Sequence, residues 1–230
     1  MVRGFTQRAG VDFQETFTPV VKPATIRTVL TIVASKQWPT RQLDVSNAFL
    51  HGNLEEYVLC QQPIGFVDPD RPQAVCRLDK SLYGLRQAPR AWFTRFATFV
   101  TKLGFKATRS DSSLFVLRRG ADMAYLLLYV DDMVLTASSS TLLQRVVTDP
   151  RFEFAVKDMG DLRFFLGIDV QRAVDGFYLS QSQYAEEILQ RAGMSNYKPA
   201  STPIDGKGKL SSDGPTIPDA KSYRSIAGAL

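Results

Sequence analysis

Cysteine, histidine and long apolar runs are scarce in this 230-residue chain, and each scarcity excludes a class of protein. Two cysteines, Cys60 and Cys76, and the single His51 are too few for a four-ligand zinc site. We expect both thiols to stay reduced in an intracellular protein. The apolar run at residues 125–130 is far too short to span a bilayer, and the N-terminus lacks a signal-peptide pattern. We therefore expect a soluble protein with no membrane partner.

The remaining composition is that of an ordinary globular protein. Hydrophobic residues make up 44% of the chain and charged residues 22%, which is enough to build a core in one large domain or two small ones. Lys and Arg number 28 against 23 acidic residues, giving a net charge of +5. This mild excess is compatible with a polyanionic partner but is weak support for one.

Periodicity and turn residues predict alternating helices and strands. Helices are expected at residues 25–35, 89–104, 138–147 and 183–192. Strands are expected at residues 41–46, 75–78, 113–118, 123–130, 133–137, 152–157, 162–170 and 177–180. Residues 53–81 otherwise read as an irregular connection with strand pieces, and residues 195–220, rich in Pro, Gly, Ser and Lys, as a linker. The order predicts an α+β fold, an antiparallel sheet with helices packed on one face.

Two adjacent acids, Asp131 and Asp132, lie between the predicted strands 123–130 and 133–137, where only a tight turn fits. Asp tolerates turn backbone, but a surface hairpin more often carries Asn-Gly or Asp-Gly, and this turn has no Gly. Taken alone, the pattern favours an ordinary turn over a metal site.

Asp44 lies between Leu43 and Val45 in another predicted strand. Asp is depleted from strands, and a half-buried charge needs a partner or a cation. The alternative is that Asp44 caps the following helix, although Ser46 and Asn47 could do so instead.

If the two strands carrying these acids are neighbours, three carboxylates meet at one sheet edge. Clustered carboxylates repel one another, and without a cation some would be driven towards protonation. Mg²⁺ prefers a few carboxylate oxygens together with substrate phosphates and water. Two such ions, roughly 3.5–4 Å apart, can clamp both oxygens of an in-line phosphoryl displacement. Carboxylates without a catalytic His or Cys therefore indicate Mg²⁺-assisted nucleotidyl transfer.

The stretch that leads into the predicted helix at residues 89–104 is basic and aromatic. Arg86, Arg90 and Arg95 lie in the loop and first turns, where a helix N-terminus already favours phosphate. Two interpretations stay open here: a phosphate cradle and a solvated face.

Three successive stretches, residues 42–52, 82–92 and 129–132, closely resemble motifs of copia-type LTR retrotransposon reverse transcriptases. Residues 157–160 and 165–167 match later motifs, and residues 223–230 look like the family's connection beyond the polymerase. The motifs follow in the family's order from about Gly4 to the last residue, so the resemblance is specific.

The resemblance implies a polymerase palm with partial fingers and gives roles to particular residues. Asp44 and Asp131 would ligate Mg²⁺, with Mn²⁺ as the alternative ion, helped by the carbonyl of Val45. Asp132 would lie beside them near the primer end.

Other motif residues would bind substrates. Phe49 would crowd the sugar 2′ position and select deoxynucleotides, and Lys157 would protonate the leaving pyrophosphate. The residues beside the incoming nucleotide and template would be Tyr83, Gly84, Arg86 and Pro89. The residues supporting the primer strand would be Phe165, Leu166 and Gly167. The alternative for Phe49 and Phe165 is core packing, and for Lys157 a solvated side chain.

The resemblance also implies a larger context. Residues 1–193 would form the palm with partial fingers, and residues 194–230 a linker and the start of the connection. We expect the chain to begin inside the fingers, near residues 1–5, and to stop before RNase H, so that lost cationic contacts weaken nucleotide binding. The implied partners are an RNA template, a DNA or RNA primer and dNTPs, in the cytoplasm within a virus-like particle or in the nucleus.

Three functions compete at this point. The leading one is RNA-directed DNA polymerisation, in which a primer 3′-OH attacks the α-phosphate of a dNTP. The second is a catalytically inactive, nucleic-acid-binding remnant, which would bind primer–template in a salt-dependent way without incorporation. The third is a palm-like nucleotide cyclase, disfavoured by the loop at Ala88 and Pro89.

Overall fold

The computed structural model describes residues 4–149, 153–174, 176–199 and 219–229. The chain divides into two compact units, one of residues 1–163 with 172–177 and one of residues 164–171 with 178–230. None of the helices in the described ranges combines the length and hydrophobicity needed to cross a membrane.

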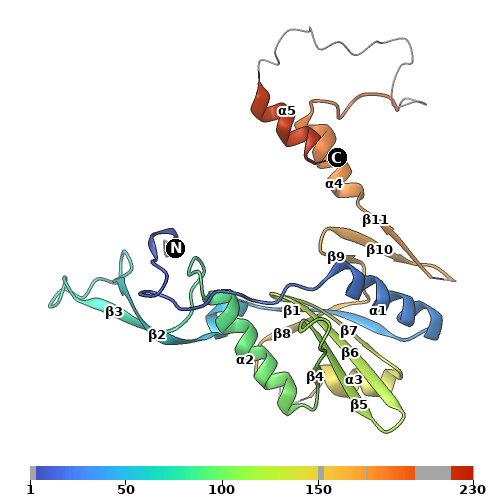
Figure 1. Ribbon diagram of the computed structural model, residues 1–230, viewed down its shortest axis with the longest axis horizontal. Helices are drawn as coiled ribbons and strands as arrows, with labels where there is room; N and C mark the ends of the chain where they lie inside the picture. The colour runs from blue at the N-terminus through green and yellow to red at the C-terminus, as the bar shows by residue number, and fades with distance from the viewer. Residues whose placement is uncertain (1–3, 150–152, 175, 200–218, 230) are drawn as a thin grey trace. The chain divides into compact units, whose positions relative to one another are not determined.

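The secondary structure alternates helices and antiparallel strands (Figure 1). The helices are η1 (Gly4–Thr6), α1 (Pro23–Lys36), η2 (Ala48–His51), α2 (Ala88–Lys102), α3 (Ser140–Val147), α4 (Ser182–Arg191) and α5 (Ala220–Ala227), the η elements being 3₁₀ turns. The strands are β1 (Thr40–Val45), β2 (Asn53–Gln61), β3 (Val75–Lys80), β4 (Lys106–Ala107), β5 (Leu114–Arg119), β6 (Asp122–Tyr129), β7 (Asp132–Ala137), β8 (Val156–Gly160), β9 (Phe164–Phe165), β10 (Ile168–Arg172) and β11 (Phe177–Ser180).

A six-stranded sheet in the order β4-β5-β6-β7-β1-β8 organises the first unit. The β5–β6 and β6–β7 pairs are antiparallel hairpins, and β1 inserts between β7 and β8 by antiparallel pairing on both sides. Separate sheets pair β2 with β3 and order the last strands β11-β10-β9. The predicted α+β class and antiparallel sheet are confirmed.

One face of the six-stranded sheet packs against α2 and α3. The shared cluster includes Leu43 and Val45 of β1, Leu126 and Leu128 of β6, Met133 and Leu135 of β7, Trp92 and Phe96 of α2, and Leu142 and Val146 of α3. Because side chains alternate along a strand, each strand contributes every second residue to this cluster. Trp92, Phe96, Phe99, Val100 and Leu103 form the core face of α2 and the residue that follows it.

The opposite face is also partly covered, which differs from the prediction that all helices lie on one side. Leu127 and Val134 alternate with the cluster residues and are buried without belonging to the cluster. Trp38, which follows α1, contacts Tyr125 on this face with ring centroids 5.6 Å apart. The prediction of one covered face therefore holds for α2 and α3 only.

Several elements were missed or misplaced by the sequence patterns. Strand β4 was not predicted, and the strand predicted at residues 162–170 is two strands, β9 and β10, joined by a turn at Leu166 and Gly167. Strand β2 belongs to a two-stranded sheet, and its side chains alternate between exposed and half-buried, so neither face is fully buried. Because neither face is buried, the sequence of β2 need not alternate in polarity, and its pattern does not identify it as a strand. Strand β8 starts later than predicted. Helix α5 begins inside the predicted linker, and Asp219 caps it by accepting hydrogen bonds from the N–H groups of Lys221 and Ser222, both 3.0 Å long. The centre of that predicted linker, residues 200–218, lies outside the described residues.

The buried carboxylate of Asp111 fixes the start of α1 from a distant loop. It accepts hydrogen bonds from the Lys22 N–H at 2.9 Å, from the Thr25 hydroxyl at 2.6 Å and from the Ser113 N–H at 3.0 Å. Burial alone would raise the pKa of this carboxyl, but these hydrogen bonds and the charge of Lys22 together lower it. Asp111 thus supplies the cap that Lys22 itself lacks.

We expect Asp111→Ala to lower the free energy of unfolding by about 2–3 kcal/mol at pH 7, because several hydrogen bonds to a buried carboxylate are lost. Since the folded-state pKa is lowered, the stabilisation is complete above the unfolded value of about 3.9 and disappears as the pH falls through the folded value. Urea unfolding between pH 7 and pH 3 measures this, with the exposed-site variant Asp70→Asn as control. Equal stability of the two variants at pH 7 would contradict the prediction.

Candidate active site

The three acids predicted to converge do meet at one edge of the six-stranded sheet. Asp44 of β1 is the direct antiparallel partner of Asp132 of β7. Asp131 precedes Asp132 in the β6–β7 turn, and its carbonyl accepts a hydrogen bond of 3.0 Å from the N–H of Val45. The expectation that neighbouring strands bring these acids together is confirmed.

The three acids bring negative charges close together at this edge. Burial, followed by the charges of Asp131 and Asp44, raises the pKa of Asp132. Among the described residues, no Lys or Arg forms an ion pair with any of the three. The edge is therefore a concentrated anionic patch.

The turn that carries Asp131 has an unusual backbone. Tyr129 pairs with Asp132, which leaves Val130 and Asp131 as a two-residue loop. Val130 has a φ of 55°, a left-handed conformation that costs a β-branched residue on the order of 1–3 kcal/mol. A type II′ hairpin turn needs positive φ at this position, which Gly usually supplies. The turn therefore forms without Gly because Val130 adopts the positive φ itself, at a cost in conformational energy.

A hydrogen bond from Trp92 holds this strained turn. The indole Nε1–H donates to the carbonyl of Val130 at 2.6 Å, and the Trp92 ring, which projects from α2, is buried in the core cluster shared with the sheet. The sequence patterns did not predict this role for Trp92. The available signal was its indole N–H, since a buried Trp usually finds a hydrogen-bond partner.

Lys157 lies beside the acids on the sheet. It is the direct partner of Asp44 across the β1–β8 pair. Directly opposed residues in an antiparallel pair project on the same face, with Cβ atoms about 4.5–5.5 Å apart. Lys157, Asp44 and Asp132 therefore form one row across β8, β1 and β7, with the Lys157 side chain exposed.

Two predicted substrate residues, Phe49 and Tyr83, lie next to the acids. Their ring centroids are 4.8 Å apart, and the hydroxyl of Ser81 donates to the Phe49 carbonyl. Burial and then the charges of Asp131 and Asp44 raise the pKa of Tyr83, which places its hydroxyl within their electrostatic range. Phe49 packs against the core cluster, as the core-packing alternative expects, but the residue is only half-buried.

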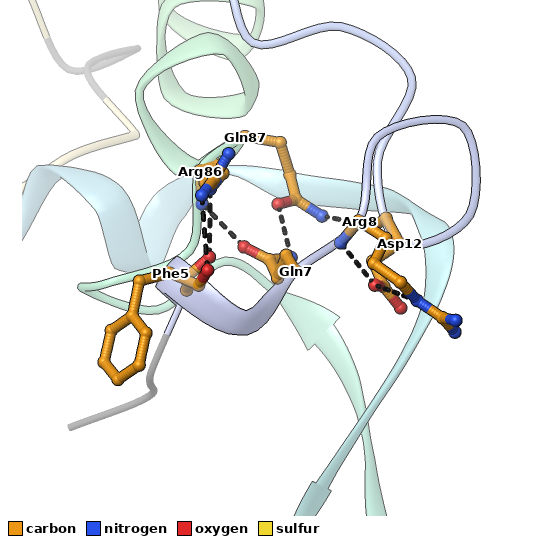
Figure 2. A network of polar contacts seen from close by, with 7 residues as sticks. Phe5, Gln7, Arg8, Asp12, Arg86 and Gln87 are labelled. Carbon is orange, nitrogen blue, oxygen red and sulfur yellow. Dashed lines mark hydrogen bonds and ion pairs between the residues drawn. The ribbon is translucent and has the colours of Figure 1, made fainter.

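Arg86 and Gln87 bind the N-terminal segment in a network shown in Figure 2. The Arg86 Nε–H donates to the Gly4 carbonyl at 3.0 Å, and the Arg86 backbone N–H donates to the Gln7 side chain at 2.9 Å. The Gln7 amide donates in turn to Gln87 at 3.0 Å. Gly84 sits against this segment, because a Cβ on Gly4 would lie 1.7 Å from the Gly84 carbonyl oxygen. The segment at residues 4–13 thus fixes the loop that carries the predicted substrate residues.

The other arginines of the proposed phosphate cradle also have protein partners. Arg90 pairs with Glu15 at 2.7 Å, and Arg95 lies 3.8 Å from Glu153 while donating to the His51 carbonyl at 2.8 Å. Pro89 occupies the first turn of α2, where its missing N–H costs no hydrogen bond. These contacts give Arg90 and Arg95 structural roles beyond a solvated face.

The predicted primer residues form a turn in the second unit. Phe165 ends β9, and Leu166 and Gly167 connect it to β10 with φ values of 53° and 77°. Two successive positive φ angles are typical of a type I′ hairpin turn. Their role at the primer strand stays a prediction.

The ligand set predicted for the metal is small. Within the described ranges, no three or more His, Cys, Asp or Glu side chains are gathered tightly enough to hold an ion by themselves. The predicted set has only two carboxylates, Asp44 and Asp131, with the Val45 carbonyl, and so relies on oxygens from a substrate.

Comparison with known proteins decides the family. Residues 1–206 match the family described as reverse transcriptase (RNA-dependent DNA polymerase). The chain belongs to this reverse transcriptase family. The predicted resemblance to copia-type retrotransposon reverse transcriptases is confirmed.

Plant transposon proteins are among the relatives of this chain. It is 46% identical over 231 aligned residues to the retrovirus-related Pol polyprotein from transposon RE2 of Arabidopsis thaliana, and 45% identical to that from transposon RE1. It is 42% identical over 214 residues to the retrovirus-related Pol polyprotein from transposon TNT 1-94 of Nicotiana tabacum. These alignments cover 92–100% of this chain but 16% of each polyprotein. The reverse transcriptase domain therefore corresponds to a small part of such polyproteins.

The crowding of the acids predicts a pH-dependent stability. Because the folded-state pKa of Asp132 is raised, its unfavourable charge is absent below the unfolded value of about 3.9 and complete above the folded value. Asp132→Asn should therefore stabilise the chain at pH 7 by a change on the order of 0.5 kcal/mol, or roughly 1–2 °C in Tm. The gain should vanish near pH 4.

Thermal unfolding monitored by circular dichroism in metal-free buffer measures this gain. Asp70→Asn, which removes an acid far along the chain in the β2–β3 connection, should leave the Tm unchanged. A Tm for Asp132→Asn below that of the parent at pH 7 would refute the charge-crowding interpretation.

Proposed function

We propose that this domain catalyses RNA-directed DNA polymerisation. A primer 3′-OH attacks the α-phosphate of a template-paired dNTP, the new phosphodiester bond forms, and pyrophosphate leaves. The observation that carries the proposal is the pairing of Asp44 with Asp132, with Asp131 in the adjoining turn. The family match supports it.

The anionic edge suits a hard divalent cation. Three neighbouring acids, one of them with a raised pKa, are an arrangement that a cation would stabilise. The carboxylates of Asp44 and Asp131 and the carbonyl of Val45 would hold Mg²⁺ or Mn²⁺. Bound there, the ion would supply Lewis-acid stabilisation of the charge that develops on the phosphate oxygens.

The surrounding residues would orient the nucleotide and handle the proton. Phe49, stacked near Tyr83, would crowd the sugar 2′ position and so exclude ribonucleotides. Lys157 stands across from Asp44 with an exposed ammonium, where it can donate a proton to the departing pyrophosphate oxygen. Asp132, with its raised pKa, would lie closest to the primer end.

The loop at residues 83–89 would face the incoming nucleotide and the template. Its geometry is fixed by the segment at residues 4–13 through Arg86 and Gln87 (Figure 2). A loop held in this way would keep the reactants in a near-attack arrangement. The residues that hold it would thus raise the rate without contacting the reacting atoms themselves. We propose an RNA template, a DNA or RNA primer and dNTPs as its partners.

We expect Asp131→Asn to reduce incorporation by at least about 10³-fold, because one of two metal carboxylates is lost while the turn keeps its shape. Single-nucleotide primer extension on an RNA template with Mg²⁺ measures this. Asp122→Asn, at the other end of β6, is the matched control and should retain the parent's rate. An Asp131→Asn protein as active as the parent would overturn the proposal.

The same assay separates the competing functions. Salt-dependent primer–template binding without any incorporation by the parent would indicate a non-catalytic remnant. Conversion of a lone nucleotide to a cyclic product without primer would indicate a cyclase.

A further inference from the structure

The β2–β3 hairpin places the only two cysteines of the chain opposite each other. Cys60 of β2 and Cys76 of β3 are direct partners in the antiparallel register, and both are free and half-buried. Burial, then the charge of Cys76 and a hydrogen bond with it, raises the pKa of the Cys60 thiol. The two thiols are therefore in contact and also reachable from solvent.

The cysteine pair lies one strand pair away from an organised loop, residues 62–74, and forms the neck of that loop. Gln62 holds the loop together. Its amide nitrogen donates to the carbonyls of Arg71 at 2.9 Å and Ala74 at 3.0 Å, and its oxygen accepts from the Asp68 N–H at 2.7 Å. The neck is thus held in place by the loop as well as by the strands.

Cross-strand geometry permits a bond between the two sulfurs but disfavours a permanent one. Directly opposed residues have Cα atoms about 4.5–5.5 Å apart, which lies within the range of about 4.4–6.8 Å for disulfides. Their Cβ atoms are about 4.5–5.5 Å apart, longer than the mean of about 3.8 Å in disulfides. The strands must draw together to close the bond. Because β2 and β3 form a sheet of two strands only, no third strand resists this movement.

We propose that Cys60 and Cys76 form a reversible thiol-oxidation site that reacts with small-molecule disulfides. The thiolate of one cysteine attacks the reagent RSSR, which forms a mixed disulfide and releases one RS⁻. The thiolate of the other cysteine then attacks the protein sulfur of that mixed disulfide and releases the second RS⁻. Two protein thiols are oxidised to one disulfide, RSSR is reduced to two RSH, and the bond closes the neck of the loop.

The strain expected in a Cys60–Cys76 disulfide makes the bond reversible and not a permanent structural cross-link. Strained or accessible disulfides are the readily reduced ones, whereas a structural bond resists a cellular thiol pool. The pair would be dithiol in a reducing compartment and would close only under oxidising conditions. This inference does not depend on the polymerase activity.

The test treats the folded parent chain with excess oxidised glutathione and follows intact mass and free thiols. The parent should lose both thiols without gaining glutathione, through a transient adduct. The variants Cys60→Ser and Cys76→Ser should each stop with one glutathione attached. Peptide mapping of the parent should recover the Cys60–Cys76 link, and mild dithiothreitol should restore both thiols.

The urea-unfolded parent is the control for proximity. Closure of the internal bond should be at least about tenfold faster in the folded chain, because the strands hold the thiols together. Two stable glutathione adducts on the folded parent, a disulfide-linked dimer, or equal closure rates in folded and unfolded chains would each overturn the proposal. The parent alone decides the outcome, so it does not depend on the variants folding.

Discussion

The register between β1 and β7 is the constraint on which the site depends. It pairs Asp44 with Asp132 and, one residue earlier, buries Leu43 opposite Met133 in the core. Because side chains alternate along a strand, a slip of one residue would expose this core pair and bury the acid. The hydrophobic core therefore fixes the position of the acids, and the stability of the sheet and the geometry of the site follow from the same pairing.

Two local features at this edge work against stability. Val130 takes a left-handed conformation that suits Gly better, and Asp132 is crowded by two other carboxylates. The surrounding structure overcomes both: Trp92 binds the Val130 carbonyl, and the strands on either side form continuous ladders. Strain and like-charge crowding gathered at one turn, and held there by a well-packed scaffold, are typical of functional sites.

The sequence predicted what depends on local pattern. The β5–β6–β7 meander and the helices α1 to α3 follow from buried periodicity and turn residues, and the meeting of Asp44 with Asp132 followed once their strands were assumed to be neighbours. It did not predict contacts between distant segments. Arg86 was open to interpretation as a phosphate ligand, yet it binds Gly4, and nothing local in either stretch identifies the other. The extent of β2 was not predicted, only strand pieces within residues 53–81, because a two-stranded sheet imposes no polarity alternation.

We propose that the acidic edge holds a divalent cation through Asp44 and Asp131. Mn²⁺ binding followed by electron paramagnetic resonance tests it most directly, since bound and free Mn²⁺ differ in signal and Mg²⁺ competes. In the presence of a dNTP, we expect the parent to bind Mn²⁺ and Mg²⁺ to displace it. Asp44→Asn and Asp131→Asn should lose that binding, and Asp70→Asn should keep it. Equal Mn²⁺ binding by the parent and the two site variants would contradict the account.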